Sequence, residues 1–489
     1  MKQLFNFLLF VSLYTNAVAQ DTTTSYKLFL GTGEYSPKDN WHGIIRMDSI
    51  NDFGTSPDTV SYSPESTIPI KECLDNGVSL NFGHGFYYKQ SNDELYVSLL
   101  FTNQNNIITT NTDTAKGSIA IFSDVSNRDS AQVDNFRHIF GDSTQLKQPH
   151  GCWVDESRDM LYVANTFGES ILVYNNASTI DGNVAPDRVI TNFDLGRPVY
   201  IFIDTVVDRM FVTCMGGMTG GASQVVIYND ASTIDGNVAP DIRIFGTETK
   251  LSNINATVHN VWFKGNGELI AVGHHTHELS IFDLSSIDLN PVTPTSYNIS
   301  ARRINVNNQS DLSDSVDVNL YGLFWDTKND IIYCSVGADN PNGGPKLNSP
   351  PNAIKVYKNI SDTSVHGFVT PDRVIYWDNG GTYFPPQPVW LVEKTTISNA
   401  IKEPVKLNQI NAYPNPAKGI IQLEINSTKP MEVELQLFNT TGMLIISEKI
   451  NLTNGKNFKQ LNIEQNSKGI YLLKINAENE VISKKIVLE

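Results

Sequence analysis

A unit of four short, β-rich runs recurs along this sequence, with turn residues between the runs. Its clearest copy reads GCWVD, MLYVAN, SILVYN and DRVITN, between residues 151 and 192. The same order of runs begins again near residues 83, 197, 258 and 320. Four strands per unit, repeated around an axis, are typical of a β-propeller. The repeat therefore predicts an all-β fold with five complete blades.

Two fragments, one from each side of these units, complete a sixth blade. Residues 388–394 match a first strand only, whereas 26–50 match a second and a third strand. We expect residues near 57–62, PDTVSY, to supply the fourth strand. Joining strands from both sides leaves no open sheet edge between the first and last blades. The expected propeller spans 25–395 and resembles six-bladed propellers of the NHL and YncE-like kind, a resemblance that concerns the fold and not the function.

The eleven residues ASTIDGNVAPD occur twice, at 177–187 and at 231–241. Each copy follows a third strand and precedes a fourth, so it forms the C–D connection of its blade. The Asp-Gly pair supplies turn chemistry, and the proline stiffens entry into an outer strand. We interpret the stretch as scaffold left by duplication of a blade. A calcium site at Asp181 and Asn183 is the alternative.

The bulk properties predict an exported protein. Residues 1–19 have a basic start, an apolar run and a small-residue cleavage site, as in a signal peptide. That run is too short to be a membrane anchor, and we expect no transmembrane segment. A net charge of −16 argues against nucleic acid as a partner, and we expect a monomer.

Four cysteines remain in a chain bound for a compartment that permits disulfides. Cys152, Cys214 and Cys334 lie inside apolar runs with strand character, which favours buried free thiols over disulfide bonds.

One face of the predicted propeller carries the variable loops and most of the histidines. In a propeller, the B–C loops and the entries to strand A share a face, and these loops differ from blade to blade here. Loops that vary on a repeated scaffold are where function usually lies. The first positions of the six A strands are His84, His150, Val199, His259, Tyr321 and Val389. Loops of the same face add His42, His274, His275 and His277, and Arg197 lies beside it.

Three imidazoles from inner strands that converge on the axis could bind one metal ion. Zn²⁺ accepts histidine nitrogens, and a catalytic site leaves one position for water. The setting QPHGCWV around His150 resembles peptidyl-α-hydroxyglycine amidating lyase, a six-bladed propeller whose zinc histidines open strand A. The resemblance implies Zn²⁺ or another divalent metal at His84, His150 and His259. In the alternative interpretation, His84 and His150 only start a strand and bond to neighbouring loops.

Three functions remain open for the propeller. The leading hypothesis is an extracellular or cell-surface binding module for an unknown small molecule, glycan or protein. The alternative is a metal-dependent lyase or hydrolase, and the third is a purely structural spacer. The sequence contains no GxSxG elbow, phosphate loop or dinucleotide fingerprint.

The composition changes near residue 396, after which the chain has no Asp, Arg, His, Cys or Trp. We expect a linker over 396–409 and a small, Ig-like antiparallel β-sandwich over 410–489, because short apolar alternations follow one another with turns between them.

The tail contains the motifs YPNP, LFNTTG, GIYLLKI and the basic end SKKIVLE, in this order. With these motifs it resembles the type A C-terminal sorting domain of the type IX (Por) secretion system. The resemblance implies export through the outer membrane of a Gram-negative bacterium, after which the tail is usually cleaved. A generic adhesive sandwich is the alternative to this sorting role. The residues that carry the motifs are Tyr413, Pro414, Asn415, Pro416, Gly442, Gly469, Tyr471, Lys484 and Lys485.

Overall fold

The computed structural model describes most of the chain and divides it into two compact units. Residues Thr24–Thr395 form one unit, and Thr396–Glu489 belong to the second. The predicted signal peptide, 1–19, lies outside the described residues. Those described are 21–32, 43–48, 58–62, 66–69, 80–101, 117–128, 135–216, 223–251, 257–265, 267–274, 278–306, 318–338, 353–377, 386–398, 407–477 and 480–489.

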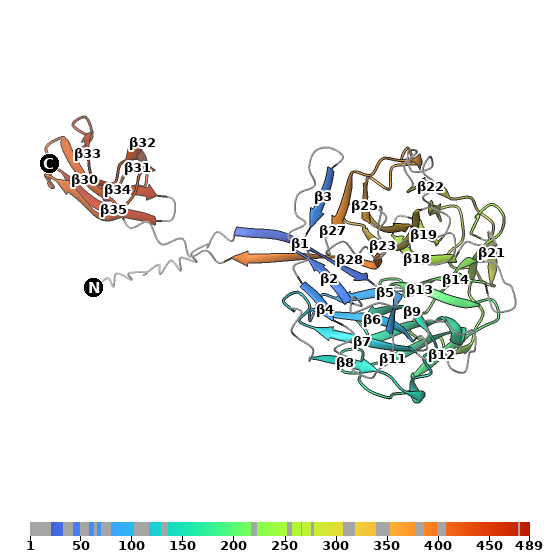
Figure 1. The fold of residues 1–489 in the computed structure, drawn as a ribbon. Helices are drawn as coiled ribbons and strands as arrows, with labels where there is room; N and C mark the ends of the chain where they lie inside the picture. The colour runs from blue at the N-terminus through green and yellow to red at the C-terminus, as the bar shows by residue number, and fades with distance from the viewer. Residues whose placement is uncertain are drawn as a thin grey trace, which may run out of the picture. The chain divides into compact units, whose positions relative to one another are not determined.

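Six antiparallel four-stranded blades make up the first unit, as the repeat predicted (Figure 1). Within each blade the strands A, B, C and D follow one another from the inner to the outer edge of the sheet. Blade one has β5 (Leu80–Lys89), β6 (Glu94–Phe101), β7 (Gly117–Ser123) and β8 (Phe136–Ile139). Blade two has β9 (Pro149–Asp155), β10 (Met160–Asn165), β11 (Ser170–Asn175) and β12 (Arg188–Thr191). Blade three has β13 (Arg197–Asp204), β14 (Arg209–Met215), β15 (Gln224–Tyr228) and β17 (Ile242–Ile244).

The remaining blades follow the same plan, and the last draws on both sides of the unit. Blade four has β18 (Thr257–Lys264), β19 (Glu268–His274), β20 (Glu278–Asp283) and β22 (Arg302–Asn305). Blade five has β23 (Val318–Asp326), β24 (Ile331–Ala338), β25 (Ala353–Lys358) and β27 (Arg373–Trp377). Blade six has β28 (Pro386–Ser398), β1 (Asp21–Thr32), β2 (Gly43–Met47) and β4 (Ser66–Pro69).

An aspartate with a left-handed backbone closes the A–B turn in four blades and ties it to the start of the C–D connection. Aspartate tolerates this conformation better than most residues. Its carboxylate accepts both the N–H and the hydroxyl of a serine that follows strand C, with hydroxyl distances of 2.6 to 2.8 Å. The pairs are Asp93–Ser126, Asp159–Ser178, Asp208–Ser232 and Asp330–Ser361.

The duplicated stretch ASTIDGNVAPD joins neighbouring blades. In the second copy, β16 (Gly236–Asn237) pairs in parallel with β12, the outer strand of the preceding blade. In the first copy, Gly182 makes the same kind of bridge to Ile139 at the end of β8. The Asp181 carboxylate accepts the backbone N–H of His138 at 2.7 Å, and Asp235 accepts that of Val189 at 2.9 Å. These contacts support the scaffold interpretation, because Asp181 and Asn183, the residues considered for calcium, already accept the backbone N–H groups of His138 and Ser143.

The C–D connections of other blades also pair with the outer strand of the preceding blade, and we call this pairing the backward reach. The C–D connection of blade four contributes β21 (Thr295–Tyr297) to blade three, and that of blade five contributes β26 (Gly367–Phe368) to blade four. Arginines of the outer strands add hydrogen bonds to the C–D connection of the next blade. Arg188 in β12 donates to the carbonyls of Ala231 and Ile234, at 3.1 and 2.6 Å. From blade one to blade five, each blade is thus hydrogen-bonded to the next at its outer rim.

The fourth strand of blade six was predicted wrongly. Residues 57–62 were expected to be that strand, but β3 (Asp58–Tyr62) pairs in parallel with β27 of blade five. The outer strand of blade six is β4 instead, which pairs with β2. The physical reason is the backward reach, because β3 lies in the C–D connection of blade six and such connections add to the preceding blade.

The three described cysteines are buried free thiols, as predicted. Cys152, Cys214 and Cys334 lie in β9, β14 and β24, on three different blades. Burial raises the pKa of the Cys152 thiol to about 12 and raises the pKa of the other two further. Cys73 lies outside the described residues.

Two antiparallel sheets form the second unit and confirm the predicted sandwich. One sheet has β29 (Leu407–Tyr413), β30 (Ile420–Ser427) and β33 (Gly455–Asn462). The other has β31 (Met431–Asn439), β32 (Leu444–Leu452), β34 (Gly469–Ala477) and β35 (Glu480–Leu488). Alternate side chains of β30 are buried in a shared apolar core, as the period-two pattern requires.

Candidate ligand-binding site

The inner strands bring aromatic rings together near the ends that lead into the A–B turns. Five blades place an aromatic residue at the fourth position of strand A, counted from the first positions that the sequence repeat defines (His84, His150 and their equivalents). These residues are Tyr87, Trp153, Phe202, Trp262 and Phe324. Ring centroids of neighbours lie 4.7 Å apart for Trp153–Phe202, 4.9 Å for Tyr87–Trp153 and 4.9 Å for Trp262–Phe324. Such pairs are mostly edge-on or tilted, the arrangement that aromatic quadrupoles prefer. We call these rings, with Trp390, the axial aromatic cluster.

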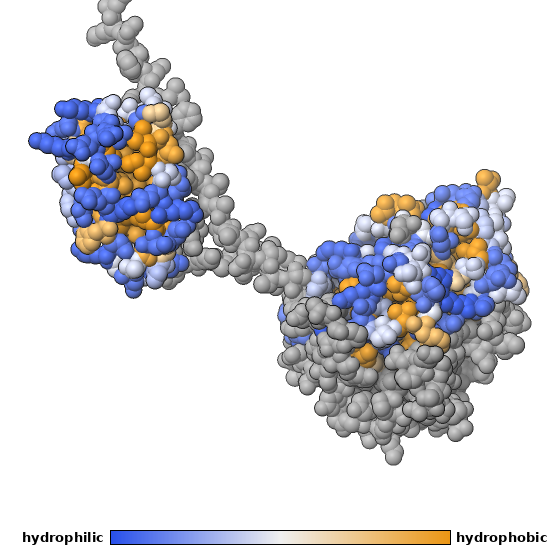
Figure 2. All heavy atoms as spheres, turned by 90° about the horizontal axis from the view of Figure 1, so that it is seen from above, coloured by the Kyte–Doolittle hydropathy of each residue, from blue (hydrophilic) through white to orange (hydrophobic). Residues whose placement is uncertain are grey.

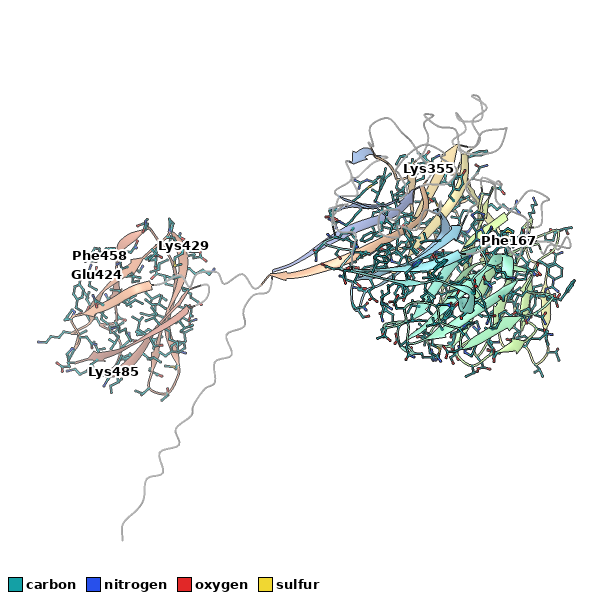
Figure 3. All side chains as sticks on the ribbon, turned by 60° about the horizontal axis from the view of Figure 1, so that its bottom comes forward. Phe167, Lys355, Glu424, Lys429, Phe458 and Lys485 are labelled. Carbon is teal, nitrogen blue, oxygen red and sulfur yellow. The ribbon has the colours of Figure 1, made fainter. Side chains whose placement is uncertain are left out.

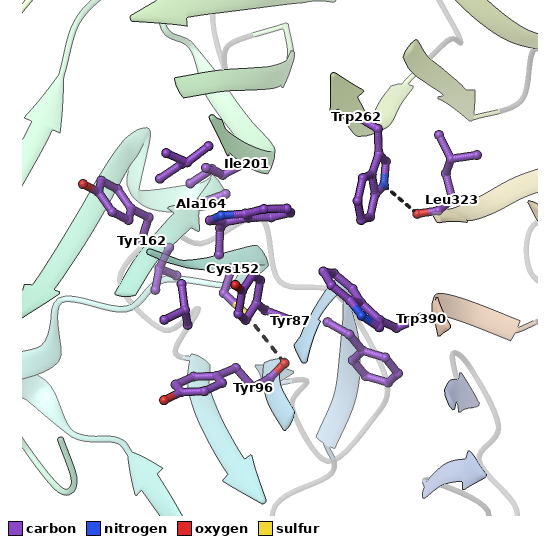
Figure 4. Close-up of a cluster of buried hydrophobic side chains, with 14 of the residues drawn as sticks. Tyr87, Tyr96, Cys152, Tyr162, Ala164, Ile201, Trp262, Leu323 and Trp390 are labelled. Carbon is purple, nitrogen blue, oxygen red and sulfur yellow. Dashed lines mark hydrogen bonds between the residues drawn. The ribbon is translucent and has the colours of Figure 1, made fainter. Parts of the chain in front are cut away.

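Trp390 of blade six contacts four other members of this cluster. Its ring centroid lies 5.2 Å from Phe324, 5.3 Å from Trp262, 5.4 Å from Tyr87 and 6.0 Å from Trp153. Figure 4 shows Trp390 beside Tyr87 and Trp262, with the Trp262 indole donating to the Leu323 carbonyl at 2.9 Å. One side chain from β28 therefore joins blade six to four other blades.

A cavity of about 360 Å³ opens over this cluster. Its size falls within the range of small-molecule sites. The A–B turns of blades one, two and five and the end of β28 supply its rim. We call it the turn-face pocket, and it is lined by Tyr26, Tyr87, Tyr88, Gln90, Glu156, Trp262, Phe324, Trp325, Asp326, Thr327, Lys328, Trp390, Leu391, Val392 and Glu393.

The polar groups of the rim differ in how far they are already engaged. The Lys328 ammonium contacts both oxygens of Glu393, at 3.1 and 3.2 Å. Asp326 accepts the Asn329 backbone and side-chain N–H groups, so it holds its own turn. Glu156 is exposed and accepts the Tyr87 hydroxyl at 3.1 Å. Burial and then the Glu156 charge raise the pKa of Tyr87 far above its ordinary value.

The first positions of strand A, which the sequence singled out, lie at β-bulges in five blades. The pairing register shifts there in β9, β13, β18, β23 and β5. Bulges re-aim side chains and are common at the rims of closed sheets. Hydroxyls of the neighbouring blade hold the bulge carbonyls, since Ser98 donates to His150 O at 2.7 Å and Thr213 donates to His259 O at 2.8 Å.

His150 is a buried, neutral imidazole. Burial, together with the Arg197 charge, lowers its pKa to about 4, although a backbone hydrogen bond opposes the shift. Nδ1 lies 3.1 Å from the Gln148 carbonyl oxygen, so the proton of the neutral ring lies on Nδ1 and is donated to this carbonyl. The ring stacks on Phe167, which is labelled in Figure 3, and the Arg197 guanidinium lies 5.1 Å from the Phe167 centroid.

The other predicted residues of this face are only partly described. His259 and Tyr321 are buried, and Arg197 is half-buried with its Nε 4.0 Å from a Glu169 oxygen. The side chains of His84 and His274 lie outside the description, as do His42, His275 and His277 altogether. Among the described side chains, no group of three or more His, Cys, Asp or Glu could hold a metal ion. The ligand face and the metal triad therefore stay predictions.

The turn-face pocket lies at the opposite end of the inner strands from the face that the sequence favoured. Sequence reasoning missed it, although a signal existed in the aromatic at the fourth position of five A strands. That signal was ambiguous, because an aromatic in an inner strand is most often ordinary core. Trp390 lies at the second position of its A strand and not at the fourth, so the sequence alignment alone does not place it in the cluster.

The motif residues of the tail hold its strands together. The Asn415 side chain donates to the Lys485 carbonyl at 2.7 Å and accepts the Val487 N–H at 2.8 Å, which links the YPNP segment to β35. Asn439 accepts three bonds from the turn that leads to Gly442, whose φ is +83°. Tyr471 donates to the Ser467 carbonyl at 2.6 Å. Lys484 and Lys485 are exposed on β35, and Figure 3 labels Lys485 there.

A family model for the secretion system C-terminal sorting domain matches residues 411–489. This segment is a Por-type secretion sorting domain. A sorting domain of this kind implies contact with the secretion machinery and passage across the outer membrane to the cell surface or the exterior. Figure 2 shows hydrophobic residues gathered between hydrophilic ones on the surface of the sorting domain. In the described residues, no helix has the length and apolar character needed to cross a membrane.

Solved structures offer distant similarities to the whole fold. A chain of a nidogen/laminin complex is 12% identical over 76% of this chain and 98% of that chain, with a TM-score of 0.38. A putative 6-phosphogluconolactonase from Bacteroides uniformis is 10% identical over 89% and 99%, with a TM-score of 0.36. A protein of unknown function from Bacteroides caccae is 11% identical over 76% and 99%, with a TM-score of 0.41. No curated protein matches the sequence.

Proposed function

We propose that the propeller is an extracellular or cell-surface binding module that holds a small ligand in the turn-face pocket. The supporting observation is the pocket itself, which combines a buried aromatic floor with a few polar groups on its rim. This composition is typical of sites that bind small molecules. On this proposal the chain leaves the cytoplasm through a Sec signal, and the sorting domain then carries it outward as a monomer.

Blocking the pocket with a bulky side chain tests the proposal. Thr327 is exposed in the A–B turn of blade five and lines the pocket, so Thr327→Trp should fill the mouth without disturbing the core. Thr205 occupies the equivalent turn position in blade three and does not line the pocket, which makes Thr205→Trp the matched control. Ligand screening by thermal shift, followed by calorimetry, should find compounds that stabilise the wild-type protein and Thr205→Trp but not Thr327→Trp. Equal binding to both variants would contradict the proposal.

A second candidate function is metal-assisted lyase or hydrolase chemistry at His84, His150 and His259. The observation that favours it is the neutral His150 ring, whose Nδ1 faces a backbone carbonyl, as is common for histidines that bind a metal ion through Nε2. The positive charge of Arg197 opposes a cation at the same place. A bound divalent ion would supply a Lewis acid and an activated water.

Elemental analysis of the purified protein decides this second candidate. We expect close to one divalent ion per chain, and His150→Ala should remove most of it because two imidazoles hold an ion less tightly than three. His366→Ala is the control, since His366 is exposed in a C–D connection. A wild-type protein without stoichiometric metal, and without a gain in melting temperature on adding Zn²⁺, would remove the enzyme hypothesis.

A further inference from the structure

We infer that the turn-face pocket binds an alkylated ammonium group, in preference to a neutral or anionic ligand. The inference rests on the proposed function, because it names the ligand class of the same pocket. It depends on the charges of the rim and on the aromatic and aliphatic side chains of the floor.

The rim carries more negative than positive charge. Its ionisable side chains, apart from the tyrosines, are three carboxylates and one ammonium, from Glu156, Asp326, Glu393 and Lys328. The ammonium is already paired with Glu393 at 3.1 Å. An anionic ligand would therefore be repelled by two further carboxylates and would find only a lysine that is already paired. A cationic ligand would be attracted by the same two carboxylates.

The pKa values of the pocket tyrosines also indicate a negative electrostatic potential in the pocket. Burial and then Glu393 and Asp326 raise the pKa of Tyr26. Burial and then Glu156 raise the pKa of Tyr87, and burial and then Asp93 raise that of Tyr88. Each nearby carboxylate disfavours a phenolate, and a field that disfavours an added negative charge favours a bound positive one.

The floor is suited to a cation that carries its charge on methyl groups. Nearly half of the lining residues are aromatic, and ring faces attract cations through their quadrupole. Leu391 and Val392 add aliphatic surface. Ring faces and aliphatic groups offer no strong acceptors for N–H donors, so a cation rich in N–H would lose hydrogen bonds with water. A quaternary ammonium has no N–H and loses none, and Glu156 lies at the edge to attract its charge.

Choline and its neutral isostere, 3,3-dimethylbutan-1-ol, separate charge from shape. We expect titration calorimetry on the full chain to show that choline binds about tenfold more tightly than the isostere, as cation–π and carboxylate attraction require. Glu156→Gln should weaken choline binding about three- to tenfold, and Lys328→Gln should strengthen it, because each changes one charge on the rim. Neither variant should change binding of the isostere.

Controls separate a local effect from one of overall charge. Glu432→Gln removes the same charge from an exposed position in the sorting domain and should leave choline binding unchanged. Thr327→Trp should abolish binding of choline. Each of three outcomes overturns the inference: the isostere binds as tightly as choline, Glu156→Gln has no effect, or neutral or anionic compounds occupy the pocket while choline does not. That last result would leave the proposed binding function standing, whereas failure of every compound to depend on Thr327 would remove both.

Discussion

A chain that stops at Trp377 should fail to form a stable propeller, whereas one that stops at Ser398 should keep its melting transition. The shorter chain lacks β28, which leaves β1, β2 and β4 of blade six without their inner strand. It also lacks Trp390, whose loss alone should cost about 3–5 kcal/mol by analogy with other buried aromatic deletions. Small proteins have a total stability of only about 5–15 kcal/mol, so loss of the whole strand should leave little folded protein.

Chemical denaturation of both truncated proteins, with Trp390→Ala in the full chain as a third sample, measures the effect. Trp390→Ala keeps the β28 backbone and removes only the contacts to the axial aromatic cluster, so its midpoint should fall between the other two. An unchanged transition in the chain that ends at Trp377 would mean that blade six does not close the ring.

Removal of residues 411–489 should abolish appearance of the protein outside the cell while leaving the propeller folded. The sorting domain has its own apolar core, separate from those of the blades, so its loss removes no propeller contact within a blade. Cell fractionation and immunoblotting should find the truncated chain retained inside the outer membrane. In the converse experiment, a foreign carrier with a signal peptide and residues 396–489 at its end should be exported. Normal export of the truncated protein would contradict the assigned role.

The blades could be predicted from sequence because each carries its own local pattern. Runs such as MLYVAN and SILVYN pair with neighbours a few residues away, and their turns supply recognisable Asp and Gly residues. The backward reach of the C–D connections could not be predicted in this way. β16 and β26 are only two residues long, and their partners lie in another blade, so no periodicity marks them.

The same limit explains the error at 57–62. The alternation in this segment is genuine strand pattern, since β3 does pair with a neighbour. Which neighbour it pairs with is set by the position of the segment within the connection, and not by its own residues. The turn-face pocket was missed for a related reason, because residues from five blades line it and Trp390 joins the cluster from outside the shared alignment.

The buried thiols have a consequence for the order of events during export. Once the blades are formed, Cys152, Cys214 and Cys334 are shielded from solvent, and their raised pKa leaves almost no reactive thiolate. Before folding, the same cysteines would be exposed to oxidants in a compartment that forms disulfides. A bond between cysteines of different blades would then block the ring. On the proposed export route folding must therefore outpace oxidation, and the yield of folded protein should depend on the redox state in which the chain first folds.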